Sequence, residues 1–179
     1  MNQTKTHSMK LIISPEEIQT RVAQLAAQIS QEFQGQDLVL LGVLKGAFIF
    51  MSDLARHLEM PVEMDFVRLA SYGSATESCG QITMTKDCEI DLAGRNVLVV
   101  EDIVDTGLTL KWLADKLRQR GAAQVKLCSL IDKSERREVE LELDYVGFDI
   151  PRGFLVVYGL DFDEQYRYLP GVYELHFEA

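Results

Sequence analysis

Two short, continuously apolar runs constrain the fold of this 179-residue chain more than any other feature of its sequence. They cover residues 38–43 and 97–100, and each is followed by a polar turn and an amphipathic segment. A strand with one face in water alternates apolar and polar residues, whereas a strand buried on both faces of a parallel sheet is apolar throughout. The two runs therefore predict buried parallel strands, each connected to a helix.

The flanking segments extend this pattern. Ser14, Pro15 and Glu17 form the sequence of a capping box with proline at the first helical position, so a helix should begin there and end before Gly35. Apolar segments predict five further strands, at residues 62–69, 82–86, 125–131, 154–160 and 172–176. Strands that alternate with helices predict an α/β fold with a mainly parallel, twisted sheet flanked by helices.

Composition limits the class of protein. With 47% hydrophobic residues, residues 1–179 should form one domain with a substantial core, and residues 1–9 should be loose. Three cysteines and three scattered histidines predict neither zinc nor a disulfide framework. Without a membrane-span-length apolar run, we expect a cytoplasmic protein that does not enter membranes. The net charge of −10 disfavours nucleic acid as a partner, because it repels a phosphate backbone.

Residues 97–110, VLVVEDIVDTGLTL, carry the strongest chemical signal. The buried strand ends in three acids, Glu101, Asp102 and Asp105, and then passes through Thr106 and Gly107 into a helix. Backbone N–H groups at such a turn and the positive end of the helix form a phosphate site. A simpler interpretation is that Asp105 or Thr106 only caps the helix. Capping accounts for one acid, not three, so the sequence favours a site for a phosphorylated sugar.

This block resembles the diphosphate-sugar-binding signature of the type I phosphoribosyltransferases. Four further segments are similar to the hypoxanthine-guanine phosphoribosyltransferases, so that the likeness covers roughly residues 38–170. They are Leu44-Lys45-Gly46, Ser71-Tyr72, Lys133 and residues 146–167, VGFDIPRGFLVVYGLDFDEQYR. The resemblance implies the type I fold, in which the terminal segments form a small hood over the sheet. It also implies purine salvage by a homodimer or homotetramer.

The resemblance implies a role for each matched position. Glu101 and Asp102 would engage the ribose hydroxyls directly or through Mg²⁺, and Asp161 would help to hold a second Mg²⁺. The 5-phosphate would be bound by Asp105, Thr106, Gly107, Leu108 and Thr109, with Asp105 also acting as the catalytic acid or base near N7 of the purine. The base would be bound by Lys133, Phe154 and Leu155. The pyrophosphate would be bound by Lys45, Gly46 and Arg167, and Ser71 and Tyr72 would close over the site as a mobile loop.

The implied reaction transfers the phosphoribosyl group of 5-phosphoribosyl 1-diphosphate to N9 of hypoxanthine or guanine. Positive charge grows on the sugar and negative charge on the leaving pyrophosphate, so carboxylates near the ribose and cations near the pyrophosphate suit it. Leu108 departs from relatives that carry lysine at its position. The turn binds phosphate mainly through N–H groups, so the function should survive this difference.

Three other interpretations stay open. A regulatory RNA-binding protein could keep this fold, but it would need a basic face and would not need Lys133, Phe154 and Asp161. A P-loop or dinucleotide-binding domain would need glycine motifs that the chain lacks. Within the enzyme class, a preference for xanthine is open.

Overall fold

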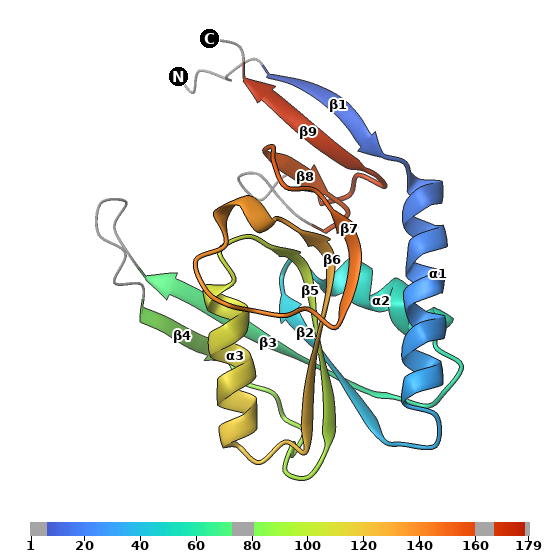
Figure 1. The fold of residues 1–179 in the computed structure, drawn as a ribbon, viewed down its shortest axis with the longest axis vertical. Coiled ribbons are helices and arrows are strands. Elements are labelled where there is room, and N and C mark those ends of the chain that lie inside the picture. The colour runs from blue at the N-terminus through green and yellow to red at the C-terminus, as the bar shows by residue number, and fades with distance from the viewer. Residues whose placement is uncertain (1–6, 73–80, 160–166, 178–179) are drawn as a thin grey trace.

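The computed structural model describes residues 7–72, 81–159 and 167–177, whose main feature is a six-stranded sheet (Figure 1). Its strands, in spatial order, are β4 (Gln81–Lys86), β3 (Glu63–Tyr72), β2 (Leu38–Leu44), β5 (Asn96–Val104), β6 (Gln124–Asp132) and β7 (Tyr145–Asp149). All neighbours pair in parallel except β4, which runs antiparallel to β3. The predicted mainly parallel α/β fold is confirmed.

The central strands β2 and β5 are apolar because both faces of the sheet are covered. Leu38 and Leu40 of β2 pack into one hydrophobic cluster, and the alternate residues Val39 and Leu41 pack into a second. Successive side chains of a strand point to opposite faces, so each run supplies both cores at once. Full burial of one such side chain contributes about 1.5–3 kcal/mol. This burial explains the two runs that the sequence displays.

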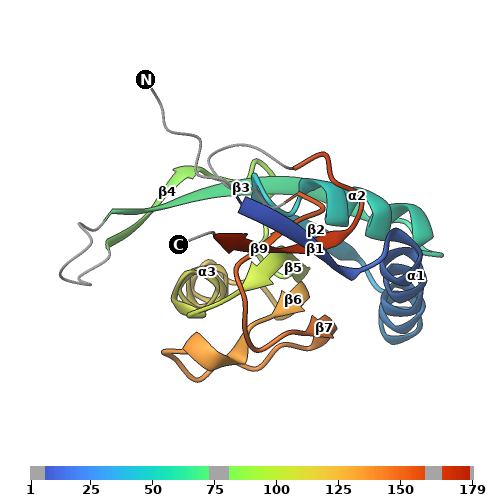
Figure 2. The ribbon, with the colours of Figure 1, turned by 90° about the horizontal axis from the view of Figure 1, so that it is seen from above.

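Helices cover the two faces unequally (Figure 2). The first cluster contains side chains of α1 (Pro15–Glu32) and α2 (Phe48–His57), and the second contains those of α3 (Leu108–Gln119). The predicted capping box is present: the Glu17 amide donates to Ser14 Oγ at 3.2 Å, and the Ser14 amide donates to Glu17 Oε2 at 2.8 Å. No helix in the described ranges is long and apolar enough to cross a membrane.

Segments from the two ends of the chain form a second, three-stranded antiparallel sheet at the top of Figure 1. Its order is β1 (His7–Ile13), β9 (Val172–Phe177) and β8 (Leu155–Val157). This sheet is the hood that the resemblance implied.

The N-terminal expectation and one strand boundary are corrected. Within the segment expected to be loose, residues 1–9, residues 7–9 form the first part of β1, because β9 supplies hydrogen-bond partners from the far end of the chain. The strand expected at residues 154–160 is only the three-residue β8 in the described part. The other predicted strands lie within one to three residues of β3, β4, β6 and β9.

Candidate active site at the end of β5

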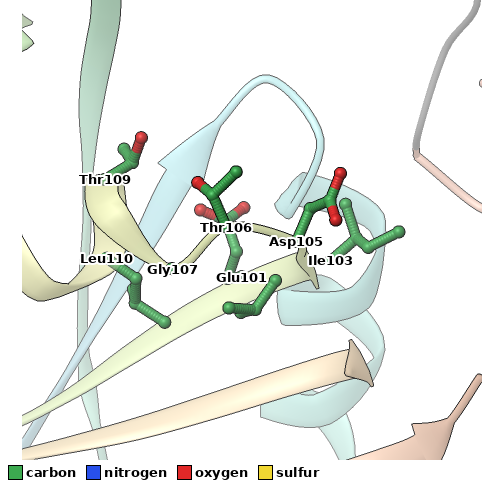
Figure 3. Close-up of a pocket in the computed structure, with 8 residues that line it drawn as sticks. Glu101, Ile103, Asp105, Thr106, Gly107, Thr109 and Leu110 are labelled. Atoms are coloured by element: carbon green, nitrogen blue, oxygen red, sulfur yellow. The ribbon is translucent and has the colours of Figure 1, made fainter. Parts of the chain in front are cut away.

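The carboxyl end of β5, the following turn and the first turn of α3 surround a pocket of about 230 Å³ (Figure 3). The lining residues are Glu101, Ile103, Val104, Asp105, Thr106, Gly107, Thr109 and Leu110. Five of them belong to the predicted phosphoribosyl site. Ligands of parallel α/β sheets bind at this end of the strands, so the pocket has the expected place in the fold.

The connection between β5 and α3 depends on Gly107. This residue has φ of +81° and occupies the N-cap position of α3, where no side chain caps the helix. Neither Asp105 nor Thr106 occupies the N-cap position, although Thr106 Oγ1 accepts a long hydrogen bond of 3.4 Å from the Leu108 amide. Glycine adopts this left-handed conformation without the steric cost that other residues meet. The turn thus brings backbone N–H groups and a helix N-terminus to the pocket, which together suit an anion.

Glu101 and Asp102 are adjacent carboxylates within β5, of which Asp102 is buried and Glu101 is partly exposed at the pocket. Burial and the neighbouring Asp102 charge raise the pKa of Glu101 well above its ordinary value. Burial also raises the pKa of Asp102, although the Glu101 contact and nearby Arg167 act in the opposite direction. The Ile103 amide donates to Asp102 Oδ1 at 2.8 Å, and the Asp102 amide donates to Glu101 Oε1 at 3.1 Å. Such a pair favours a positively charged ligand.

The turn after β2 lies directly against Asp102. A Cβ atom placed on Gly46 would be 1.7 Å from Asp102 Oδ2, so only glycine allows this approach. The Leu44–Lys45 peptide bond is cis. Gly159 lies close to the same turn. A Cβ atom placed on Gly159 would be 2.1 Å from the Gly46 carbonyl oxygen. Three separate segments therefore meet at Gly46.

Arg167 is bound to Gly159, which contacts the Gly46 turn. Its guanidinium Nη1 donates to the Gly159 carbonyl at 2.6 Å, and the Gly159 amide donates to the Arg167 carbonyl at 3.2 Å. Because Gly159 touches Gly46, the predicted pyrophosphate residues Gly46 and Arg167 are brought to one region. Lys45 belongs to the same turn as Gly46.

Asp105, the predicted acid or base, sits just beyond β5 on the pocket wall. Its Oδ2 atom pairs with Arg136 Nη1 at 3.1 Å, whereas its Oδ1 atom is buried with no hydrogen-bond partner among the described residues. A buried carboxylate oxygen without a partner is costly, and such atoms often mark the place of a ligand contact. This atom is therefore available to a group inside the pocket.

Strand register places one of the predicted base-binding residues, Lys133, at the same edge of the sheet. Val104 pairs with Asp132 of β6, and Asp132 pairs with Asp149 of β7. Asp105 directly follows β5 and Lys133 directly follows the neighbouring strand β6, so the two residues leave the sheet side by side. The Lys133 amide donates to the Val104 carbonyl at 2.9 Å. Phe154 and Leu155 come later in the chain, and Leu155 begins β8 of the three-stranded sheet. The Phe154 side chain is 46% exposed, which is unusual for a core aromatic and leaves its ring accessible.

The contacts described above do not include three of the predicted site residues, Ser71, Tyr72 and Asp161. Ser71 and Tyr72 form the end of β3, where their backbone pairs with Ile82 and Gln81 of β4, and their side chains are not described. They therefore belong to a strand, at least in part, rather than to a loop. Asp161 lies outside the described residues.

Sequence reasoning missed two arginines. Arg136 contacts the Asp105 carboxylate, and Arg137 contacts the backbone of the β5 end. Both follow the short 3₁₀ segment η1 (Ser134–Arg136) or lie within it. Arginines in a polar stretch are usually solvated, so nothing local distinguishes them. Their nearness to Lys133 in the chain was the available signal.

The residues present fit a Mg²⁺ ion that is bound together with substrate. The described residues contain no group of three or more acidic, histidine or cysteine side chains that could hold a metal alone. Mg²⁺ is commonly held by one or two carboxylates plus substrate oxygens and water. Glu101 and Asp102 supply two carboxylates whose mutual repulsion a cation would relieve.

Comparison with known proteins agrees with this geometry. Residues 14–163 match the family described as phosphoribosyl transferase domain. A hypoxanthine-guanine phosphoribosyltransferase of Bacillus subtilis strain 168 is 44% identical over 161 residues, which span 90% of this chain and 89% of that protein. A protein of the same name from Streptococcus thermophilus is 44% identical over 163 residues and 91% of each chain.

Solved structures show the same fold. A crystal structure of a hypoxanthine-guanine phosphoribosyltransferase from Bacillus anthracis aligns with a TM-score of 0.89 at 41% identity, over 96% of this chain and 100% of that one. A hypoxanthine phosphoribosyltransferase from Staphylococcus aureus aligns with a TM-score of 0.90 at 38% identity, over 93% and 91%. The chain therefore belongs to the phosphoribosyltransferase family and, within it, to the hypoxanthine-guanine phosphoribosyltransferases.

Proposed function

We propose that the protein transfers the phosphoribosyl group of 5-phosphoribosyl 1-diphosphate to N9 of hypoxanthine or guanine, in the presence of Mg²⁺. The products would be IMP or GMP and pyrophosphate. The observation that carries this proposal is the strand register, which brings the turn after Val104 and Lys133 after Asp132 to one edge of the sheet. The turn would bind phosphate there, and Lys133 with the exposed Phe154 would bind a flat, polar base.

Different groups of site residues would bind the phosphate, the base and the pyrophosphate. The turn of residues 105–109 would bind the 5-phosphate through its N–H groups, including Leu108, whose amide also lies 3.4 Å from Thr106 Oγ1. Lys133 would donate to the 6-oxo group of the base, Phe154 would stack on the ring, and Leu155 would contact its edge. Lys45, Gly46 and Arg167 would bind the pyrophosphate as it leaves, because two cations stabilise its growing negative charge.

Asp105 would take the proton from N7 of the base as N9 attacks C1 of the sugar. The bond from C1 to the pyrophosphate oxygen breaks as the new C–N bond forms, and the proton leaves the base for the carboxylate. Its unpartnered Oδ1 atom supports this role, because it can accept a hydrogen bond without first losing one. A placed general base of this kind contributes about 10²–10⁴-fold in rate.

Glu101 and Asp102 would hold the ribose hydroxyls and, with Asp161, the Mg²⁺ ions. When bound, Mg²⁺ neutralises charge on the diphosphate and orients it for departure. The carboxylates themselves would also stabilise positive charge on the sugar ring in the transition state. Ser71 and Tyr72, at the end of β3, would cover the reacting atoms and exclude water.

A spectrophotometric assay of the purified protein tests the proposal. Hypoxanthine, guanine, xanthine and adenine are compared in parallel with the sugar diphosphate, with Mg²⁺ and with EDTA in its place. We expect turnover of hypoxanthine or guanine that requires Mg²⁺. Turnover of xanthine alone would move the specificity to that base, and no turnover of any oxopurine with Mg²⁺ would overturn the proposal.

Other expectations stay predictions. They are a single domain over residues 1–179, assembly as a homodimer or homotetramer, a cytoplasmic location, and no interaction with nucleic acid or membranes. Light scattering coupled to gel filtration would measure the oligomeric state directly.

A further inference from the structure

Arg137 connects the phosphate-binding turn to two other segments. Its Nε atom donates to the Asp105 carbonyl at 3.1 Å, and its Nη2 atom donates to the Val104 carbonyl at 3.4 Å. The same guanidinium forms an ion pair with Asp132 at the end of β6, and its Nη1 atom donates to the Leu141 carbonyl at 3.4 Å. One side chain thus contacts the end of β5, the end of β6 and the loop before β7.

These contacts are partly shielded from water. The Arg137 side chain is 17% exposed and that of Asp132 is 22% exposed, in contrast to the 68% exposure of neighbouring Arg136. Arginine presents five N–H donors in a rigid, planar fork, so several acceptors at once fix its position. Shielded, charge-assisted hydrogen bonds are also stronger than exposed ion pairs. Arg137 is therefore a firm connection rather than a loose surface contact.

The aliphatic part of Arg137 lies against Gly107 of the turn. A Cβ atom on Gly107 would be 2.8 Å from Arg137 Cδ and 3.2 Å from Val139 Cγ2. The Glu138 amide donates to the Thr106 carbonyl at 3.0 Å. Successive residues of the segment around Arg137 therefore contact the turn, and none of them lines the pocket.

We propose that Arg137 is a positioning residue that sets the shape of the phosphate-binding turn and thereby the affinity for the phosphoribosyl group. The proposal rests on the proposed function, in which residues 105–109 bind the 5-phosphate. Backbone N–H groups bind phosphate only when they converge on it, and misplacement by about 1 Å can cost 10²-fold in rate. Arg137 holds the two carbonyls that precede those N–H groups, so it acts through the turn.

The test replaces Arg137 and measures each substrate separately. Arg137→Met keeps the apolar stem and removes all four polar contacts, whereas Arg137→Lys keeps the charge and one donor group. We expect Arg137→Met to raise KM for the sugar diphosphate by about 10- to 100-fold, the effect of losing charge-assisted hydrogen bonds. KM for hypoxanthine should change less than about threefold, because the Lys133 amide keeps its own bond to Val104. For Arg137→Lys, KM for the sugar diphosphate should lie between the values of the unmodified protein and of Arg137→Met.

Binding of ribose 5-phosphate, measured by titration calorimetry, supplies a readout that needs no turnover. Its Kd should rise in parallel with KM for the sugar diphosphate. If the unmodified protein formed no nucleotide, the proposed function would fail, while this titration would still compare the variants. The matched control is Arg118→Met, because Arg118 makes an exposed ion pair with Asp115 on α3 and should leave both constants unchanged.

A second variant separates positioning from folding. Asp132→Asn keeps an acceptor for Arg137 but removes the charge, so it should raise the same KM by a smaller factor, and its effect should not add to that of Arg137→Met. A purely structural Arg137 would lower the melting temperature and the active fraction but leave KM for the sugar diphosphate unchanged. That result would overturn the proposal. If Arg137→Met does not fold, an unchanged KM in Asp132→Asn overturns it equally.

Discussion

The two halves of β5 have opposite properties. Val97, Leu98, Val99 and Val100 are fully buried in the two hydrophobic clusters, where each side chain stabilises the fold. The next two residues, Glu101 and Asp102, are carboxylates whose pKa values are raised by burial, and for Glu101 the neighbouring Asp102 charge adds to the rise. Stabilising and destabilising residues are thus neighbours in one strand.

The difference shows how the fold sustains an unfavourable site. Burial of a Val or Leu side chain contributes about 1.5–3 kcal/mol, so the apolar half anchors the strand firmly. β2 and β6 both pair with the apolar half of β5, and β6 continues to pair with the strand beyond Val100, which restricts movement of the carboxylates. The apolar half therefore keeps the acidic half in a geometry suited to a cationic ligand. The substitutions predicted below alter one half of β5, or residues beside it, at a time.

The largest effect is expected just beyond the acidic half, at Asp105. Asp105→Asn keeps the shape of the turn but removes the proton acceptor, so the rate of the chemical step should fall by about 10²–10⁴-fold, or about 3–5 kcal/mol. Affinity for the sugar diphosphate should be largely kept. Single-turnover kinetics measure the chemical step even if product release limits kcat. Asp115→Asn on α3 is the matched control, and an unchanged single-turnover rate in Asp105→Asn would remove Asp105 from this role.

A substitution in the apolar half of β5 should lower the stability of the fold rather than the rate of the reaction. Leu98→Ala leaves a cavity in a fully buried position and should lower the free energy of unfolding by about 2–5 kcal/mol. The folded fraction should keep a near-normal kcat at low temperature. Urea titration measures the stability, with Met64→Ala as an exposed control that should cost much less. A loss of kcat without a loss of stability would contradict the division of the strand.

Gly46→Ala should disturb the acidic half from the neighbouring strand. Its Cβ would overlap Asp102 Oδ2, so the carboxylate or the turn must move, at a cost of about 1–3 kcal/mol in stability. Thermal unfolding measures this cost. The informative control is the double variant with Asp102→Ala, which removes the overlapping atoms and should make the two effects clearly non-additive. Additive effects would show that the close contact is not the cause.

The smallest effect is a gain in stability. Glu101→Gln removes a carboxylate whose pKa is raised in the folded state, so the ligand-free protein should become more stable at pH 7 by about 1 kcal/mol while activity falls. Urea titration at pH 7 checks the gain, and Glu140→Gln, an exposed position, serves as the control. A loss of stability in Glu101→Gln would mean that the charged pair stabilises the fold.

The same variant has a defined pH dependence. The folded state keeps the Glu101 proton at pH values where the unfolded chain has lost it. The stability from this group is therefore complete below the unfolded pKa, near 4.5, and is lost as pH rises through the higher folded value. Glu101→Gln should flatten the decline in stability above pH 4.5, as measured by unfolding at a series of pH values. An unaltered slope would assign the decline to other groups.

The sequence predicted the strand, turn and helix around the pocket well because these elements are contiguous in the chain. Glu101, Asp105 and Gly107 lie within seven residues, and a single strand, turn and helix place all three on one pocket, while Asp102 of the same strand lies against Gly46. The base and pyrophosphate residues were assigned only through a family resemblance, because Lys133, Phe154 and Arg167 have no local pattern that distinguishes them from surface or core residues.

The amino-acid order by itself determined the buried strands β2 and β5, the capped start of α1 and the phosphate turn, because period, caps and turn chemistry act over a few residues. Only the tertiary structure decided that β1 pairs with β9, that Gly46 touches Asp102, and that Arg137 supports the turn. These contacts join segments that are far apart in the chain. They depend on register and close packing, which no short stretch of sequence specifies.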